Sequence, residues 1–204
     1  MNPSIKTASL ALGAIILSGC VAVLAALAQP AANTAPSYTE AGRLVFPIAY
    51  RKWVFLSSGH DMSYLPAPVR RMSTFGNVFV SPQSHDAFLQ SGTWPDKTVL
   101  VLEVRRAEQE GSINRNGHFQ SEVVRHEVHL KDVARFSASG GWAFFAFATE
   151  APADMIPRTA NCYSCHEANA AVDTTFVQFY PTLLPIARAK NTLSAPYLAA
   201  ESRN

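Results

Sequence analysis

The chain has 204 residues, with 17 Lys and Arg against 15 Asp and Glu, for a formal net charge of +2. This mild charge, with no basic run that carries interleaved aromatic side chains, argues against nucleic acid as a partner. Without an N-terminal leader roughly 175 residues remain, enough for one domain with a hydrophobic core.

Residues 1–28 have the features of a secretory or lipoprotein leader. Lys6 supplies a positive charge, and no charged residue occurs from Thr7 to Ala28. Three fates stay open. Cleavage could follow Ala28 in an A-x-A site, Cys20 could carry a lipid because Leu17-Ser18-Gly19-Cys20 resembles a bacterial lipobox, or the uncharged run could remain as a membrane anchor. All three predict a bacterial protein located in the periplasm, or anchored to the membrane and facing away from the cytoplasm.

Composition also divides the rest of the chain. Residues 29–40 are mostly small, polar or proline, which predicts a tether. The main domain is expected over residues 41–190. Residues 191–204 have little periodicity, and we expect them to form a flexible tail.

The main domain is predicted to be an α+β structure. Helices are expected at 41–50, where Pro47 would interrupt the pattern, at 84–90 with an N-terminal serine cap, and at 159–171. Strand-like composition or alternation occurs at 75–81, 98–106, 119–131 and 142–149. Successive strands without helices between them favour antiparallel pairing, so we expect an antiparallel sheet with flanking helices.

The most informative motif is Cys162-Tyr163-Ser164-Cys165-His166. Two cysteines three positions apart, followed by histidine, are the attachment signature of a c-type haem. The two thiols form thioethers with the haem, and the imidazole of His166 is the proximal ligand of the iron. This motif predicts a haem attachment segment in the C-terminal part of the domain.

The cysteine pair has two alternative interpretations, a structural zinc site and a redox-active pair. A structural zinc site needs four ligands, and the chain has no second cysteine pair, since Cys20 lies in the leader. A thioredoxin-like redox pair belongs in an alternating α/β pattern, which is not seen near residue 162. One covalently attached haem c is therefore the favoured cofactor.

The sixth ligand of such an iron is not evident. No Met or His occurs between Glu167 and Asn204, so a sixth ligand would have to come from upstream, where Met62, Met72 and Met155 are found. A five-coordinate haem can bind a small molecule at iron, whereas a six-coordinate haem mainly transfers electrons.

Several runs of the sequence resemble the family of cytochrome P-460 and cytochrome c′-beta. The resemblance extends in order from Tyr38 to Ala189. It is carried by Tyr50–Val54, Gly92–Val101, Gly141–Phe145, Cys162–Asn169 and Phe176–Pro181. It implies a mainly antiparallel sheet with helices, a five-coordinate haem near the C-terminal segment with an open distal side, and often a homodimer.

The resemblance also singles out Leu102. Hydroxylamine-oxidising members carry a lysine, cross-linked to the haem, in a pattern like T-V-L-V-K-E, and Thr98–Glu103 has leucine at that position. Strand alternation puts Leu100, Leu102 and Val104 on one face of the sheet. Lys97 is five residues before Leu102, so in a regular strand it would point to the opposite face. We expect Leu102 to face the haem without reacting, as in the c′-beta group.

Phe75 and Phe79 share one strand parity and are, with Leu102, the candidates for lining the distal pocket. The alternative for both is ordinary sheet core. Such a pocket is expected to hold no charged group and to suit a small uncharged diatomic. His126 is expected to be a hydrogen-bonded core histidine, with His129 on the opposite face.

The sequence favours an exported mono-haem c-type cytochrome whose five-coordinate iron binds a diatomic ligand such as nitric oxide. One alternative is a P-460-type oxidoreductase acting on hydroxylamine or nitric oxide, and another is a periplasmic electron carrier that serves a redox partner protein. Whether the chain is an enzyme stays open at this point.

Overall fold

A computed structural model of the chain describes residues 34–64 and 72–203. The predicted leader, Cys20 and the first part of the tether lie outside the described residues. In the part that is described, no helix has both the length and the hydrophobicity needed to span a membrane.

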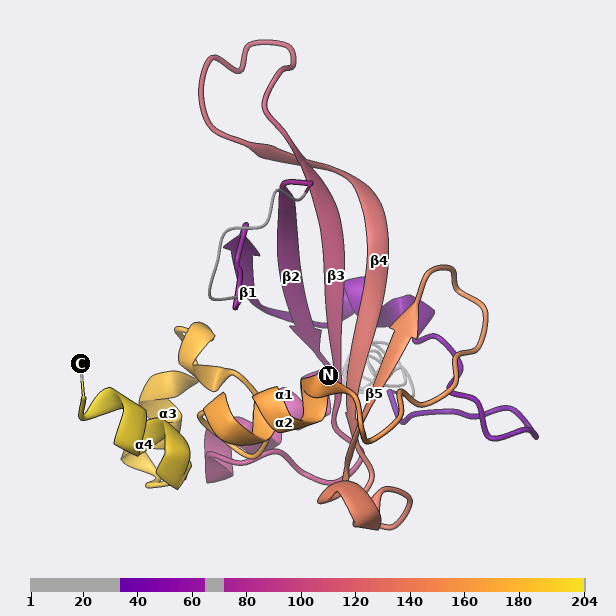
Figure 1. Ribbon diagram of the computed structural model, residues 1–204, viewed down its shortest axis with the longest axis vertical. Helices are drawn as coiled ribbons and strands as arrows, with labels where there is room; N and C mark the ends of the chain where they lie inside the picture. The colour runs from indigo at the N-terminus through magenta and orange to yellow at the C-terminus, as the bar shows by residue number, and fades with distance from the viewer. Residues whose placement is uncertain (1–33, 65–71, 204) are drawn as a thin grey trace, which may run out of the picture. The chain divides into compact units, whose positions relative to one another are not determined.

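The domain is built on a five-stranded antiparallel sheet in which every strand pairs with its neighbours in sequence (Figure 1). The order β1-β2-β3-β4-β5 comprises Val54–His60, Thr74–Val80, Val99–Glu108, Phe119–Lys131 and Trp142–Phe147. In residues 34–64 and 72–203, seven short helices accompany it: η1 (Ile48–Lys52), α1 (Pro82–Ser91), η2 (Ser137–Ser139), α2 (Asn161–Asn169), η3 (Val177–Phe179), α3 (Leu184–Ala189) and α4 (Ala195–Glu201). The predicted α+β class, an antiparallel sheet with flanking helices, is confirmed.

All four predicted strands occur, and β4 has both of its predicted ends. The additional strand, β1, was not expected from the sequence. It contains Ser57, Ser58 and Gly59, and its pairing with β2 shifts between Phe55 and Ser57. A polar, glycine-containing strand with an irregular register lacks the alternation on which strand prediction rests.

Helix ends follow local chemistry. Pro82 occupies the first turn of α1, with Ser81 as the N-cap, so the helix starts before the predicted residue 84. Gly92 ends the same helix in a left-handed conformation. The helix expected over 41–50 is replaced by the short 3-10 helix η1, which begins directly after Pro47.

The structure adds detail at two predicted boundaries. Within the segment expected to be a flexible tail, Ala195–Glu201 form α4, which is capped by the Ser194 hydroxyl, and Tyr197 packs on the core. The tether is also shorter than predicted, since Tyr38 forms a bridge with Leu44, and the Val45 amide donates to the Ser37 carbonyl. Neither segment has the periodicity on which strand and helix prediction rests, although Ser194 and Pro196 form a local helix-start signal.

Each face of the sheet packs against its own hydrophobic cluster. One cluster joins the sheet to α1 and α3, and includes Val80, Phe88, Trp94, Leu100 and Leu183. The other includes Leu44, Tyr50, Val101, Val128 and Phe145. The alternation of β3 separates the two, because successive side chains of a strand point to opposite faces.

The second face also holds a buried carboxylate, Glu103, which is 3% exposed. Tyr50 Oη donates to it, Arg51 Nη2 lies 2.8 Å from its Oε2, and Arg105 Nε lies 2.6 Å from its Oε1. Burial alone would raise the pKa of Glu103, but the hydrogen bonds from Arg105, Tyr50 and Arg51 lower it to about 2. Glu103 therefore stays ionised and joins η1 to β3.

This network makes the stability of the protein dependent on pH. Glu103→Gln removes the charge that pairs with Arg51 and Arg105. At pH 7 we expect the free energy of unfolding to fall by about 3 kcal/mol, the low end for breaking a buried ion pair, because both arginines are partly exposed.

The pKa of Glu103 is lowered in the folded protein, so its stabilisation is present above the ordinary value of 4.5 and is lost as the pH falls towards 2. Urea unfolding of wild type and variant should therefore converge across that window. A difference that does not change with pH would contradict this account.

Candidate functional site

The motif helix α2 is fixed to the domain by Tyr163. Its buried ring meets Phe144 of β5 edge-on, with ring centroids 4.9 Å apart, and its hydroxyl donates to the Ile156 carbonyl at 3.0 Å. The Arg158 guanidinium lies 4.8 Å from the centre of the same ring. Sequence reasoning missed Tyr163, because an aromatic between the two cysteines has no signature of its own.

With Tyr163 buried, the neighbouring motif side chains face a cavity. Cys162 and His166, four positions apart on one side of the helix, both line it. Cys162 and Cys165 are free thiols of intermediate exposure. The helix therefore presents one thiol and one imidazole to the cavity, with the second thiol, Cys165, next to His166 in sequence.

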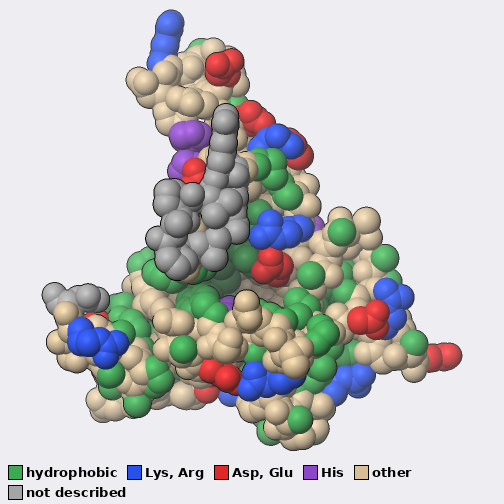
Figure 2. Space-filling model, viewed as in Figure 1, with side chains coloured by type: hydrophobic (Ala, Val, Ile, Leu, Met, Phe, Trp, Pro, Cys, Tyr) green, Lys and Arg blue, Asp and Glu red, His purple; other side chains and the backbone are tan. Residues whose placement is uncertain are grey.

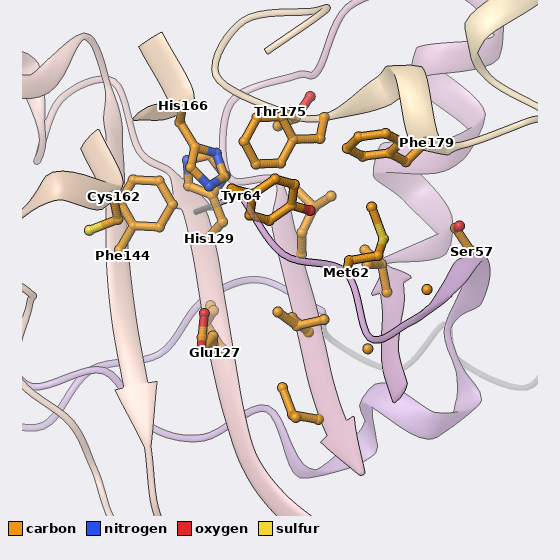
Figure 3. Close-up of a pocket in the computed structure, with 18 of the residues that line it drawn as sticks. Ser57, Met62, Tyr64, Glu127, His129, Phe144, Cys162, His166, Thr175 and Phe179 are labelled. Carbon is orange, nitrogen blue, oxygen red and sulfur yellow. The ribbon is translucent and has the colours of Figure 1, made fainter. Parts of the chain in front are cut away.

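The cavity has a volume of about 450 Å³, within the usual range of cofactor sites. It lies against β2, β3 and β4, next to α2 and the segment around η3 (Figure 3). Figure 2 shows hydrophobic side chains gathered around a hollow in the visible face. The sheet contributes mainly small or apolar side chains: Gly76, Val78, Leu100, Leu102 and Val104.

The structure places Leu102 in the cavity wall. It pairs with Val78 on β2 and with Glu127 on β4, and all three side chains line the cavity. A Cβ atom added to Gly76 would lie 3.1 Å from Leu102 Cδ1, so the absence of a side chain at Gly76 leaves room beside Leu102.

Phe75 and Phe79 do not line the cavity, and their predicted place in the distal pocket is wrong. Phe79 pairs with Val101 and packs on Tyr50 at a centroid distance of 5.4 Å, on the opposite face. Phe75 stacks on His60 at 4.6 Å. The two rings do lie on one face of β2, as their spacing of four residues predicts. The pairing of β2 with β3 decides which face that is, and it is the face opposite Leu102.

The expectation of a cavity without charged groups is also wrong. Arg125 and Glu127 both line it, and Arg125 Nε lies 2.8 Å from Glu127 Oε1. Glu127 is the residue that pairs directly with Leu102. The pairing of β3 with β4 contains two irregularities, near Val104 and Arg105, so this neighbour could not be obtained by counting along the hairpin.

Among the described residues, His166 makes a hydrogen bond through only one of its two ring nitrogens. Its Nδ1–H donates to the Thr174 carbonyl at 2.7 Å, which leaves Nε2 as the nitrogen available to a metal. Phe176 and Phe144 flank the ring at centroid distances of 4.2 and 4.7 Å. Burial lowers the pKa of His166, which favours the neutral form that a metal ligand requires.

A second histidine, His129, lies beside the first (Figure 3). Its ring stacks on Phe144 with centroids 4.0 Å apart and 11° between the planes. Burial, and secondarily the proximity of His166, hold the pKa of His129 well below its ordinary value. His126 lies on the opposite face, buried and 2.9 Å from the Tyr50 hydroxyl, as expected of a core histidine.

The residues present fit a c-type haem. The Cys162 thiol and the His166 imidazole line a largely apolar volume, and the free Cys165 thiol lies on the same helix, although it is not among the lining residues. Across the described residues, no group of three or more His, Cys, Asp or Glu is arranged to hold a metal ion, so the zinc alternative finds no additional ligands there.

A model of the family Cytochrome P460 matches residues 47–177. The chain belongs to the cytochrome P460 family. Members of this family are cytochromes that bind haem c, and the matched segment contains the cavity strands and all of α2. Among curated proteins, none matches the chain.

The two faces of this cytochrome P460 sheet should respond differently to substitution. Gly76→Val would crowd Leu102 and narrow the cavity, so we expect slower binding of carbon monoxide to the reduced haem. Phe79→Leu, on the opposite face, should cost about 1–2 kcal/mol of stability and leave that rate unchanged. Flash photolysis measures both rates, and a slower rate only in Phe79→Leu would overturn the assignment of the faces.

Proposed function

We propose that the chain is an exported cytochrome that carries one haem c and binds a small diatomic ligand, such as nitric oxide, at a five-coordinate iron. Thioethers to Cys162 and Cys165 would attach the haem, and His166 would be its axial ligand. The bound haem supplies an iron with one position free for the diatomic.

The observation that carries this proposal is the distribution of donor side chains around the cavity. Besides His166 and the Cys162 thiol, four of its described lining residues have side chains of the kinds that can ligate haem iron: His129, Met62, Tyr64 and Tyr180. His129 lies against His166, with ring centroids 5.1 Å apart. Met62 folds over Gly59, where its sulfur would clash with an added Cβ. In this proposal none of these four side chains binds the iron.

The apolar wall has a defined task in this proposal. Leu102, Val78 and Phe176 present apolar surface to the cavity that His166 lines, and apolar surface favours an uncharged ligand over a charged one. No lysine lines the cavity within the described residues, and Lys97 is paired with Asp132 and Asp96 instead. The haem is therefore proposed to lack a lysine cross-link.

Optical spectroscopy of the purified holoprotein tests the proposal. The reduced protein should give the spectrum of an ordinary high-spin c-type haem, without a red-shifted Soret band, and nitric oxide should change that spectrum at once. A low-spin reduced spectrum that is indifferent to diatomic gases would instead support the electron carrier.

Glu127 favours a second candidate, an oxidoreductase acting on hydroxylamine or nitric oxide. Its carboxylate lies in the cavity wall next to Leu102 and can accept a proton from a nitrogenous substrate. If this candidate is correct, the wild type oxidises hydroxylamine in the presence of an electron acceptor, and Glu127→Gln slows the reaction by about 100-fold or more. Glu122→Gln, on an exposed carboxylate of the same strand, is the matched control.

The position of Leu102 gives a separate prediction. Leu102→Lys would place an amine in the cavity, and we expect it to form a covalent bond to the haem after treatment with peroxide. Intact mass and a red-shifted Soret band report the bond, and Leu102→Met controls for side-chain size without an amine. Unchanged mass and spectra in Leu102→Lys would contradict the placement of residue 102 beside the haem.

The N-terminal sequence and the family membership together support export of the protein. Members of the cytochrome P460 family are typically exported, and the N-terminal sequence supports the same route for this chain. Cleavage after Ala28, a lipid on Cys20 and an uncleaved anchor are the three proposed fates. The mass of the mature N-terminal peptide distinguishes them. We also propose a homodimer and a redox partner protein.

A further inference from the structure

The turn Val172–Thr175 is held more firmly than its length suggests. Val172 and Thr175 form a bridge, with the Thr175 amide donating to the Val172 carbonyl at 2.8 Å. The Thr175 hydroxyl donates to the same carbonyl, also at 2.8 Å. Asp173 has a φ of 52°, a left-handed conformation that tightens the turn.

Three side chains from elsewhere in the fold hold successive residues of this turn. Lys131 Nζ of β4 lies 3.1 Å from the Asp173 carboxylate, and Trp94 Nε1 donates to the Thr175 hydroxyl at 2.7 Å. Between them, His129 Nε2 is hydrogen-bonded to the Thr174 hydroxyl at 3.1 Å. A segment this constrained has its carbonyl groups fixed in direction.

Thr174 connects the two histidines of the cavity. Its hydroxyl is bonded to His129, and its carbonyl accepts the Nδ1–H of His166 at 2.7 Å. His129 is itself held by the stacked ring of Phe144, while its ring meets that of His166 edge-on at 76°. The order of contacts is therefore Phe144, His129, Thr174 and His166.

We propose that His129 is a positioning residue for the axial ligand: it fixes Thr174, and through the Thr174 carbonyl it sets the strength of the hydrogen bond at His166 Nδ1. This inference rests on the proposed function, because it requires His166 to ligate the haem iron. A stronger hydrogen bond at Nδ1 makes the imidazole a better donor to iron, which strengthens the iron–histidine bond and favours the oxidised state.

Direct ligation by His129 does not fit these contacts. Its Nε2 is already engaged by Thr174, and its ring stands beside His166. A purely packing role is the other explanation, since the stack on Phe144 would be kept by any flat ring. A variant that keeps a flat ring at position 129 but removes the hydrogen bond to Thr174 separates the two explanations. It should change the iron–histidine bond only if His129 positions the axial ligand.

His129→Phe and Thr174→Val in the holoprotein make this separation. Each removes the bond between positions 129 and 174 and keeps the side-chain volume approximately. We expect the iron–histidine stretching band of the reduced protein, seen by resonance Raman spectroscopy, to move to lower frequency. The reduction potential should rise. The double variant should shift no further than either single variant, because both break the same bond.

Two further variants complete the test. His129→Gln retains a hydrogen-bonding side chain and should recover part of the wild-type frequency. His126→Phe is the matched control, since it makes the same change at a buried histidine on the opposite face of β4, hydrogen-bonded to Tyr50. It should lower stability and leave the iron–histidine band unchanged.

The outcomes distinguish this inference from the proposed function. If the reduced wild type shows no iron–histidine band, the proposed function fails. If the wild type shows the band and Thr174→Val leaves both frequency and potential unchanged, the positioning role is overturned and the proposed function stands. Should His129→Phe fail to fold, Thr174→Val alone tests the positioning role, because it replaces only one hydroxyl group by a methyl group.

Discussion

The hydrogen bond from His166 Nδ1–H to the Thr174 carbonyl, 2.7 Å long, is the contact on which the site depends. It decides which nitrogen of the imidazole is free to meet a metal, and it joins the motif helix α2 to a turn that β4 and Trp94 hold in place. In the proposed function the motif would attach the haem, while the sheet forms much of the cavity wall.

Strand β3 shows how one element serves both stability and function. Leu102 faces the cavity, while Glu103, the next residue, points to the opposite face and binds two arginines and a tyrosine. The buried ion network thus holds the strand from the face opposite the cavity, at the position where Leu102 contributes an apolar side chain to the cavity wall. A change of register by one residue would exchange the two side chains, placing a carboxylate at the haem and a leucine among unpaired cations. The pairing of Leu102 with Val78 and Glu127 therefore fixes both residues of β3 at once: Leu102 faces the cavity and Glu103 faces the ion network.

Local patterns predicted the parts that local chemistry determines. The helix that carries the Cys162–His166 motif, β4 and the alternation that sends Leu102 to one face and Glu103 to the other could all be obtained from the sequence, because spacing along one element suffices for them. Phe75 and Phe79 were assigned to the wrong face because parity groups residues and leaves open which group meets the cavity. Glu127 was missed because its place beside Leu102 depends on irregular pairing between two strands. The polar strand β1 lacks alternation and pairs with β2 in an irregular register, so its own residues do not indicate it. Helix α4 does have a local start signal, Ser194 as N-cap with Pro196 in the first turn, which could have indicated it.

A crystal structure of the reduced holoprotein would test the central claim most directly. The account predicts a porphyrin bonded to the sulfur atoms of Cys162 and Cys165, with His166 Nε2 on the iron and His166 Nδ1 on the Thr174 carbonyl. It also predicts that no protein side chain lies on the opposite side of the iron. Met62 or another side chain coordinated there, or a porphyrin held without bonds to the two cysteines, would contradict it.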